Sequence, residues 1–360
     1  MHVNTLAAWA ALAVNLTSLL TPSTVNERGV LLRIEPGLSN AGGHVPTIKV
    51  NIAGNIPDGE LYPSMLRRTH KKPFNRDTVD GGPRSLNIVT NSNLEIRSLD
   101  IRMNAYRNGK RGPRISLNDE MCLASLVWTP RDTRPNYDSR RGAISGDLMY
   151  FCGYNWYPSG KVYNGYELRC GWLDGDNSLS NSVKGLYLDL DKFGKGFVEA
   201  HARVNANTSS FCSNGLRFYP GNLPLSKRSV APESNNNSIA TTSAITLTPK
   251  NAFRNKAFLS TRVSAIELCD DPTSYGPSMV NTREGIFCDM TTKTKVPMCD
   301  SNRTERCMDF SRLQKRDPAL YRNLEAKNVP PNLISYSSFQ IEYFTLTDVN
   351  GTIIDNGSNI

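Results

Sequence analysis

The chain has 360 residues, of which 39% are hydrophobic and 8% aromatic, which is enough to bury the core of one large or two ordinary domains. Its net charge is +9, but the basic residues are scattered as pairs and form no block of the kind that binds nucleic acid. The charge fits a weak attraction to acidic cell walls or membrane surfaces. The sequence has no Gly-rich phosphate loop, no Gly-x-Ser-x-Gly elbow and no fixed-period repeat, so it predicts neither a nucleotide enzyme nor a serine hydrolase, and no cofactor.

The N-terminus predicts export. Residues Leu6 to Leu20 are almost wholly apolar and end at a polar break, which is typical of a signal peptide over residues 1–20 with a cleavage site after Ala13. Polar residues interrupt the stretch, and a spanning helix needs about 20 continuous apolar residues, so no stable membrane span is expected. Because the stretch lacks a basic start, a buried N-terminal helix is the alternative.

Short apolar runs separated by turn clusters recur from residue 25 to residue 226 and predict a β-rich domain. Helical periodicity is scarce there, which favours an antiparallel sandwich or jelly-roll arrangement over an α/β sheet. The expected strands are Val30 to Ile34, Thr47 to Ile52, Leu86 to Thr90, Leu94 to Met103, Cys122 to Trp128, Asp147 to Cys152, Tyr166 to Leu173, Leu186 to Asp191 and Phe197 to Val204.

The eight cysteines predict four disulfide bonds, because their number is even and no C-x-x-C pair suggests zinc or thiol redox chemistry. They are Cys122, Cys152, Cys170, Cys212, Cys269, Cys288, Cys299 and Cys307. Four bridges allow 105 pairings. If Leu148 to Cys152 and Tyr166 to Trp172 are neighbouring strands, Cys152 and Cys170 share a face, and we expect a cross-strand bond between them.

Aromatic residues are dense between Phe151 and Trp172. The alternation in the second expected strand places Tyr166 and Trp172 on the cysteine-bearing face, where they would be buried. Trp156 and Tyr157 fall in an expected loop, and side chains of this type stack on sugars and anchor protein interfaces. We therefore take these two as candidate ligand-binding residues, with packing over a small loop core as the alternative.

Residues 186 to 204 predict a hairpin with a charged face, because two alternating halves flank a Gly-containing turn. The charged face would gather Asp189, Asp191, Glu199 and His201. Carboxylates about 5–10 Å apart are what glycoside hydrolysis requires, and Asp and His on adjacent strands could also hold a metal. The ordinary alternative is a solvated strand face with cross-strand charge pairs.

A second acidic segment, Asp174-Gly-Asp-Asn-Ser178, resembles the start of a calcium loop. The twelfth position of such a loop, where a bidentate Glu belongs, is Gly185, and flanking helices are not indicated. A plain Asp/Asn turn is the better interpretation, and no metal site is predicted.

Residues 227–238 form a polar, turn-rich linker that begins with Lys227-Arg228, a pair that secretory processing proteases cut when it is exposed. An uncut basic loop is the alternative; a cut chain would become two, with or without a disulfide between them. The C-terminal region, residues 239–360, is expected to be smaller and stapled by disulfide bonds, with strands at Ala244 to Leu247 and Phe339 to Leu346. A short helix is expected after Asp317-Pro318.

Six Asn-x-Ser/Thr sequons support the secretory route. Those at Asn350 and Asn356 stand in Asn-Gly turns, where a glycan could point into water, and are the favoured sites. The remaining sequons begin at Asn15, Asn207, Asn236 and Asn302.

The last cysteine segment runs from Cys269-Asp-Asp-Pro-Thr-Ser-Tyr-Gly-Pro through Glu284-Gly-Ile-Phe-Cys288-Asp-Met to Cys299 and Cys307. It resembles the C-terminal cysteine module of uncharacterised secreted proteins from filamentous ascomycete fungi. The resemblance implies a fungal, extracellular protein and brings no catalytic residues. Together these observations predict a secreted glycoprotein that binds a surface, wall or host partner, such as a glycan or an acidic surface. An extracellular carbohydrate-active hydrolase is the alternative.

Overall fold

The fold is taken from a computed structural model of the chain, and it is mainly β, as the sequence predicts. The structure describes Leu12, Leu16, Cys212 and Phe253 as single residues and the stretches 29–37, 47–53, 84–89, 95–102, 120–130, 141–174, 183–193, 216–219, 256–299, 307–309, 322–327, 339–348 and 352–355. We call residues 29–219 the N-terminal part and residues 253–355 the C-terminal part.

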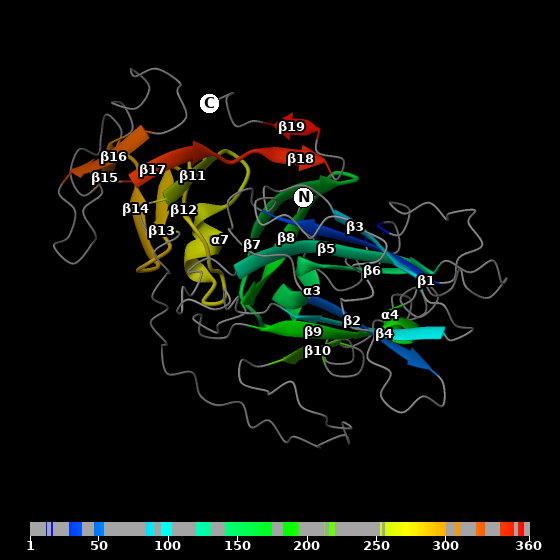
Figure 1. Ribbon diagram of the computed structural model, residues 1–360. Helices are drawn as coiled ribbons and strands as arrows, with labels where there is room; N and C mark the ends of the chain where they lie inside the picture. The colour runs from blue at the N-terminus through cyan, green and yellow to red at the C-terminus, as the bar shows by residue number, and fades with distance from the viewer. Residues whose placement is uncertain are drawn as a thin grey trace, which may run out of the picture.

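The largest sheet has eight strands and draws on both parts of the chain (Figure 1). In spatial order these are β19 (Ile353–Asp355), β18 (Leu346–Asp348), β7 (Trp156–Tyr163), β8 (Tyr166–Asp174), β5 (Glu120–Pro130), β1 (Gly29–Pro36) and β3 (Arg84–Val89), while β6 (Gly142–Ser145) pairs with the second half of β5. All these pairs are antiparallel except β18 with β7, which is parallel. The C-terminal strands therefore complete a sheet built by the N-terminal part.

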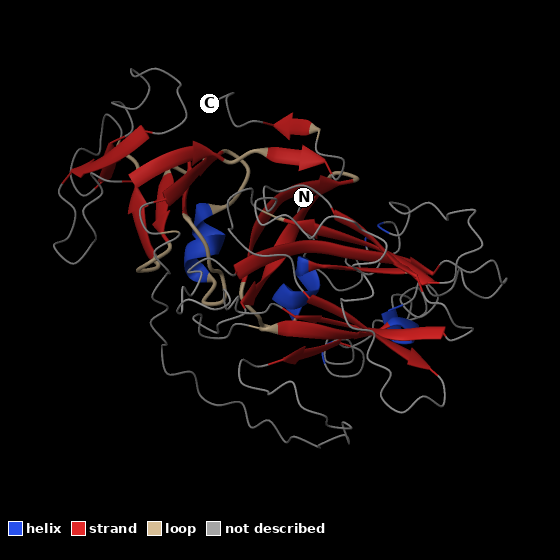
Figure 2. Ribbon diagram, in the orientation of Figure 1, coloured by secondary structure: helices blue, strands red, loops and turns tan. Residues whose placement is uncertain are grey.

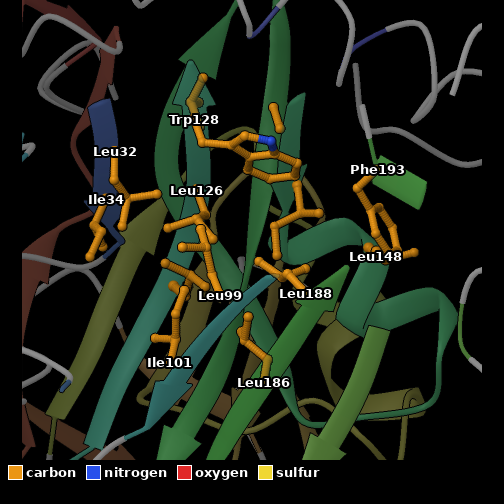
Figure 3. Packing of buried hydrophobic residues seen from close by; sticks show 14 of the residues in the cluster. Leu32, Ile34, Leu99, Ile101, Leu126, Trp128, Leu148, Leu186, Leu188 and Phe193 are labelled. Carbon is orange, nitrogen blue, oxygen red and sulfur yellow. The ribbon is translucent and has the colours of Figure 1, made fainter. Parts of the chain in front are cut away.

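A second, antiparallel sheet covers one face of the first and makes a sandwich with it. Its order is β10 (Leu216–Tyr219), β9 (Gly185–Asp189), β4 (Glu95–Arg102) and β2 (Thr47–Ala53). Figure 3 shows the core between the sheets, to which the first contributes Leu32, Ile34, Leu126 and Trp128 and the second contributes Leu99, Ile101, Leu186 and Leu188. The predicted antiparallel sandwich is confirmed.

The two central strands of the largest sheet are buried on both faces. In β5, Met121 and Leu123 belong to the sandwich core, whereas Cys122 and Ala124, which alternate with them, belong to a second core that β5 shares with the C-terminal part. Strands covered on both sides need near-continuous apolar sequences, which β5 has. The largest sheet is thus the middle of three layers, between the second sheet and the C-terminal part.

The C-terminal part forms a third, mixed sheet that carries one helix (Figure 2). Its strands, in order, are β14 (Thr294–Pro297), β13 (Ile286–Asp289), β12 (Ser278–Asn281), β11 (Lys256–Ser260), β17 (Phe339–Tyr343), β16 (Arg322–Lys327) and β15 (Cys307–Asp309). Strand β11 is parallel to both of its neighbours. The helix, α7 (Ala265–Asp270), packs on β12, β13 and β14. It begins at Ser264, whose hydroxyl accepts a hydrogen bond from Glu267 N at 3.0 Å, as an N-cap does.

Residues 146–151 form a helix, α3 (Gly146–Phe151), where the sequence predicts a strand, and that prediction is wrong. Two glycines bring the helix directly onto β8. A Cβ on Gly146 would lie 2.4 Å from the Arg169 carbonyl oxygen, and one on Gly171 would lie 2.1 Å from Met149 Sδ. Alternation over so few residues does not distinguish a strand from a short helix buried on one side.

All eight cysteines form disulfide bonds, as predicted. The pairs are Cys122–Cys170, Cys152–Cys212, Cys269–Cys288 and Cys299–Cys307. The predicted Cys152–Cys170 bond is wrong, because Cys152 caps the end of α3 and is not a strand residue in register with Cys170. Cys170 instead bonds across to the neighbouring strand β5.

Most of the other expected strands are present, with ends that differ by a few residues. The expected strand at Phe339 to Leu346 is two strands, β17 and β18, in different sheets. The sequence missed β7, because Pro158-Ser-Gly160 suggests a turn. In the structure these residues form a bulge inside the strand, where Gly160 has a φ of 72°.

Several predictions fall outside the described residues. They are the strands at Phe197 to Val204 and Ala244 to Leu247, the helix after Asp317-Pro318, the linker with Lys227-Arg228, and the asparagines of all six sequons.

Of the apolar N-terminal stretch the structure describes Leu12 and Leu16, which are helical and buried in the sandwich core. Their spacing places them on one face of a helix, in line with the alternative of a buried N-terminal helix. Cleavage of a leader stays a prediction. Among the described residues no helix is long and apolar enough to cross a membrane.

Candidate functional site

The charged face expected on residues 186–204 is described only in its first half. Leu186, Leu188 and Leu190 are buried and Asp189 is half-buried. The prediction that the leucines face the core and Asp189 faces away from it is therefore confirmed. The predicted hairpin is wrong: α4 (Leu190–Phe193) follows β9, and β4 and β10 occupy both edges of that strand.

Only a hairpin over residues 186–204 would place Asp189 on the same sheet face as Glu199 and His201. Without that cross-strand pairing, nothing in the register of β9 brings them together. Glu199 and His201 lie outside the described residues, as does the side chain of Asp191. The calcium-like segment is also outside, apart from Asp174, which is buried at the end of β8.

Trp156 and Tyr157 are core residues of β7, so their prediction as loop residues open to a ligand is wrong. Their exposed fractions are 1% and 0%. Trp156 donates its indole N–H to Asp271 Oδ2 at 3.1 Å, and the Tyr157 hydroxyl donates to the carbonyl of Pro277 at 2.7 Å. Both rings therefore hold the C-terminal part against the largest sheet.

The described residues include a buried guanidinium at the same contact, that of Arg169 in β8. Its side chain is 1% exposed and forms ion pairs with Asp147 of α3 at 3.3 Å and Glu267 of α7 at 2.8 Å. Its guanidinium carbon also lies 4.2 Å from the ring centre of Tyr150 and 4.9 Å from that of Trp156. The two carboxylates neutralise the charge of the guanidinium, and the two aromatic rings pack on its flat face.

The two carboxylates of this cluster differ in access to water. Asp147 is fully buried and accepts a further hydrogen bond from Ser145 Oγ at 2.9 Å, whereas the Glu267 side chain is 37% exposed. Burial raises the pKa of Asp147 to about 6, and Arg169 acts in the opposite direction. Two carboxylates in unequal surroundings are a feature of acid–base sites. Here, however, the more perturbed one is sealed from any substrate.

A second buried charge cluster lies where β1 approaches β7. Glu35 is 0% exposed, with its carboxylate 3.8 Å from Lys161 Nζ and 3.9 Å from Arg33 Nη2, and neither of its oxygens has a hydrogen-bond partner among the described residues. Burial raises the pKa of Glu35 to about 7, although both cations oppose the shift. Lys161 also donates to Thr347 Oγ1 of β18 at 3.1 Å, which links this cluster to the C-terminal strands.

A third group pairs a serine with a lysine, a combination that some hydrolases use as nucleophile and base. Ser274 Oγ contacts Lys293 Nζ, and burial lowers the pKa of Lys293 to about 8. The lysine donates to the carbonyls of Leu268, Asp271 and Ser274, and the serine hydroxyl donates to Leu268 O at 2.5 Å. Because Ser274 is 0% exposed, this pair fastens the end of α7 and is closed to substrate.

The Arg169 and Glu35 clusters thus join different elements of the fold, and Lys293 holds the end of α7. No group of three or more His, Cys, Asp or Glu side chains that could bind a metal occurs in the described stretches. Sequence analysis missed Arg169, Asp147, Glu35, Lys161 and Lys293, because isolated charged residues carry no spacing signal that predicts burial.

The described stretches expose four large apolar side chains. Ile353 and Ile354 of β19 are exposed by 62% and 48%, Tyr343 by 42% and Ile266 by 40%. The first two stand next to each other on the edge strand of the largest sheet, whose outer side is not paired within the described residues. An edge strand can receive another strand through its free backbone groups.

The architecture defines the class of protein: a mainly β, three-layer fold with four disulfide bonds. No protein-family model matches the chain, and no similar curated protein or solved structure was found.

Proposed function

We propose that the protein is a secreted glycoprotein that acts by binding an extracellular partner on a surface, a wall or a host. The observation that carries the binding role is the exposed edge strand β19, with its two adjacent exposed isoleucines. Exposed large apolar side chains at an open sheet edge are a feature of binding surfaces.

The four disulfide bonds support the extracellular setting. Such bonds persist in oxidising compartments and are rare in the cytosol. All eight cysteines are used in them, and none is left as a free thiol. The apolar N-terminal stretch and the six sequons add sequence support for the same route.

The buried chemistry supports binding over catalysis. Trp156, Tyr157, Arg169 and Ser274 are closed to solvent and have partners inside the fold. The net charge of +9 supports an acidic surface as one class of partner.

Export is tested by expressing the full chain in a eukaryotic secretory host. We expect disulfide-bonded protein in the medium, with an N-terminus at or shortly after residue 14 and with glycans on Asn350 and Asn356. Intact, unglycosylated protein retained in the cell would overturn the proposal. It would leave Leu12 and Leu16 as permanent residues of the core.

Binding is tested with the secreted protein on a glycan array, on isolated cell walls and on vesicles with anionic lipids. An Ile353→Lys variant places a charge on the edge strand, and we expect it to lose at least tenfold in affinity for whatever the native protein binds. Thr292→Lys, on an exposed turn, is the matched control because it adds the same charge away from β19. Equal loss in both variants would argue against the edge strand.

The same preparation tests hydrolysis of polysaccharides, with Asp189→Asn and Glu199→Gln as variants. Turnover that both variants abolish would overturn the binding-only role. Binding without turnover is the expected result.

A further inference from the structure

The four disulfide bonds divide between the two parts of the chain. Cys122–Cys170 and Cys152–Cys212 lie within the N-terminal part, and Cys269–Cys288 and Cys299–Cys307 lie within the C-terminal part. Since these pairs use every cysteine, no disulfide bond joins the parts. The peptide chain between them is their one covalent connection.

The contact between the parts nevertheless resembles the interior of a single domain. One buried cluster contains Trp156, Tyr157 and Trp172 from the N-terminal part and Tyr275 and Phe344 from the C-terminal part. The Trp172 ring lies 5.6 Å from that of Tyr275, edge to face. Buried aromatic pairs of this kind contribute strongly to the stability of protein interfaces.

Side chains of β7 and β8 supply hydrogen-bond donors to the C-terminal part. Four side chains of the N-terminal part donate to the segment 267–277: Arg169 to Glu267 at 2.8 Å, Trp156 to Asp271 at 3.1 Å, Trp172 to the Tyr275 carbonyl at 2.7 Å and Tyr157 to the Pro277 carbonyl at 2.7 Å. The donors belong to β7 and β8, and the acceptors belong to α7 and the chain that follows it. This pattern matches two complementary binding surfaces.

Backbone pairing extends the contact in two places. Trp156 N donates to Thr273 O at 3.2 Å, and Tyr275 N donates to Trp156 O at 2.9 Å. Further along β7, strand β18 adds in parallel register, with Thr347 opposite Lys161. The C-terminal part therefore supplies a strand to the sheet of the N-terminal part, as in strand-addition complexes.

We infer that β7 and β8 of the N-terminal part form a docking surface whose partner is the protein's own C-terminal part, and that the two parts stay bound as a noncovalent complex when the chain between them is cut. The complex depends on the aromatic donors, on Arg169 and on the added strand. This inference is independent of the proposed function, because it concerns the association of the two parts and not an external partner.

The test uses the full chain with a recognition site for a sequence-specific protease inserted after Arg228. After cleavage of the folded, oxidised protein, we expect two bands on non-reducing denaturing gels and a single co-eluting peak in native size-exclusion chromatography. One band on the non-reducing gel would reveal a disulfide bond between the parts, and separate native peaks would show that the contact does not hold them. Either result overturns the inference.

Two variants of the cleavable chain test the named contacts. Glu267→Ala removes the carboxylate that pairs with Arg169, and we expect the dissociation constant of the cut protein to rise at least tenfold, because a hydrogen bond between charged groups is lost. Asp270→Ala is the matched control on the same helix. Its carboxylate is 57% exposed and pairs with Lys295 inside the C-terminal part, so the dissociation constant should not change. Equal effects of the two variants would overturn the assignment of the contact.

Discussion

Replacing Glu35 by Gln should remove a specific pH dependence of stability. Glu35 is fully buried between Arg33 and Lys161, and burial raises its pKa from 4.5 to about 7. Gln keeps nearly the same shape and does not titrate. The variant therefore separates the effect of ionisation from that of side-chain volume.

The sign and size of the effect follow from the shift. Because the pKa of Glu35 is higher in the folded state than in the unfolded state, the folded state binds the proton more tightly between pH 4.5 and pH 7. The free energy of unfolding therefore falls as the pH rises through this interval. At 1.36 kcal/mol per unit, the shift corresponds to about 3 kcal/mol. The raised pKa of Asp147 gives a slope of the same sign, which is present in both proteins and cancels in the comparison.

The measurement is urea unfolding at closely spaced pH values from 4.5 to 8. We expect the native protein to lose about 3 kcal/mol more than Glu35→Gln across this range. Asp270→Asn, which removes an exposed carboxylate, should follow the native curve. Parallel curves for Glu35→Gln and the native protein would refute the reasoning, as would a native curve that rises relative to that of the variant.

Further variants test contacts inside the N-terminal and C-terminal parts. Gly146→Ala should cost about 3 kcal/mol or more by thermal unfolding, because the new Cβ would meet backbone atoms of β8 as close as 2.4 Å. Lys293→Met should cost roughly 3 kcal/mol, since three carbonyls at the end of α7 lose a charged donor; a loss below 1 kcal/mol would contradict this role. Replacing Cys299 and Cys307 by Ala should lower the free energy of unfolding by about 2.5 kcal/mol. Loss of Cys152–Cys212, which closes a separation of 60 residues, should lower it by roughly 4 kcal/mol, and denaturant unfolding of both variants checks this order.

Local patterns predict the β-rich fold well where one face of a strand is buried. Leu186 and Leu188 alternate with half-buried residues, and strand β9 lies where the sequence places it. The same rule fails at residues 146–151, where burial against β8 requires a helix and depends on Gly146 and Gly171. Close approach between two elements distant in sequence is not visible in the periodicity of either one.

Pairing between strands is harder to predict than the strands themselves. A Gly-containing turn suggested that β9 continues into a hairpin, but β4 and β10 occupy both of its edges. Consecutive strands often pair but do not always do so, and a Gly-containing turn alone does not determine the partner of a strand. The catalytic hypothesis built on Glu199 depended on that local pairing and loses its geometric basis with it.

The aromatic residues show why a ligand site and an internal interface look alike in sequence. Trp156 and Tyr157 each combine a large apolar ring with one hydrogen-bond donor, which suits a sugar and suits the edge of a packed segment equally well. In the fold each donor is satisfied, by Asp271 and by the Pro277 carbonyl. A group satisfied inside the protein has no reason to open to a ligand, since opening would leave Asp271 and the carbonyl without their donors. The proposed binding role therefore rests on residues such as Ile353 on β19, which at 62% is the most exposed large apolar side chain of the described fold.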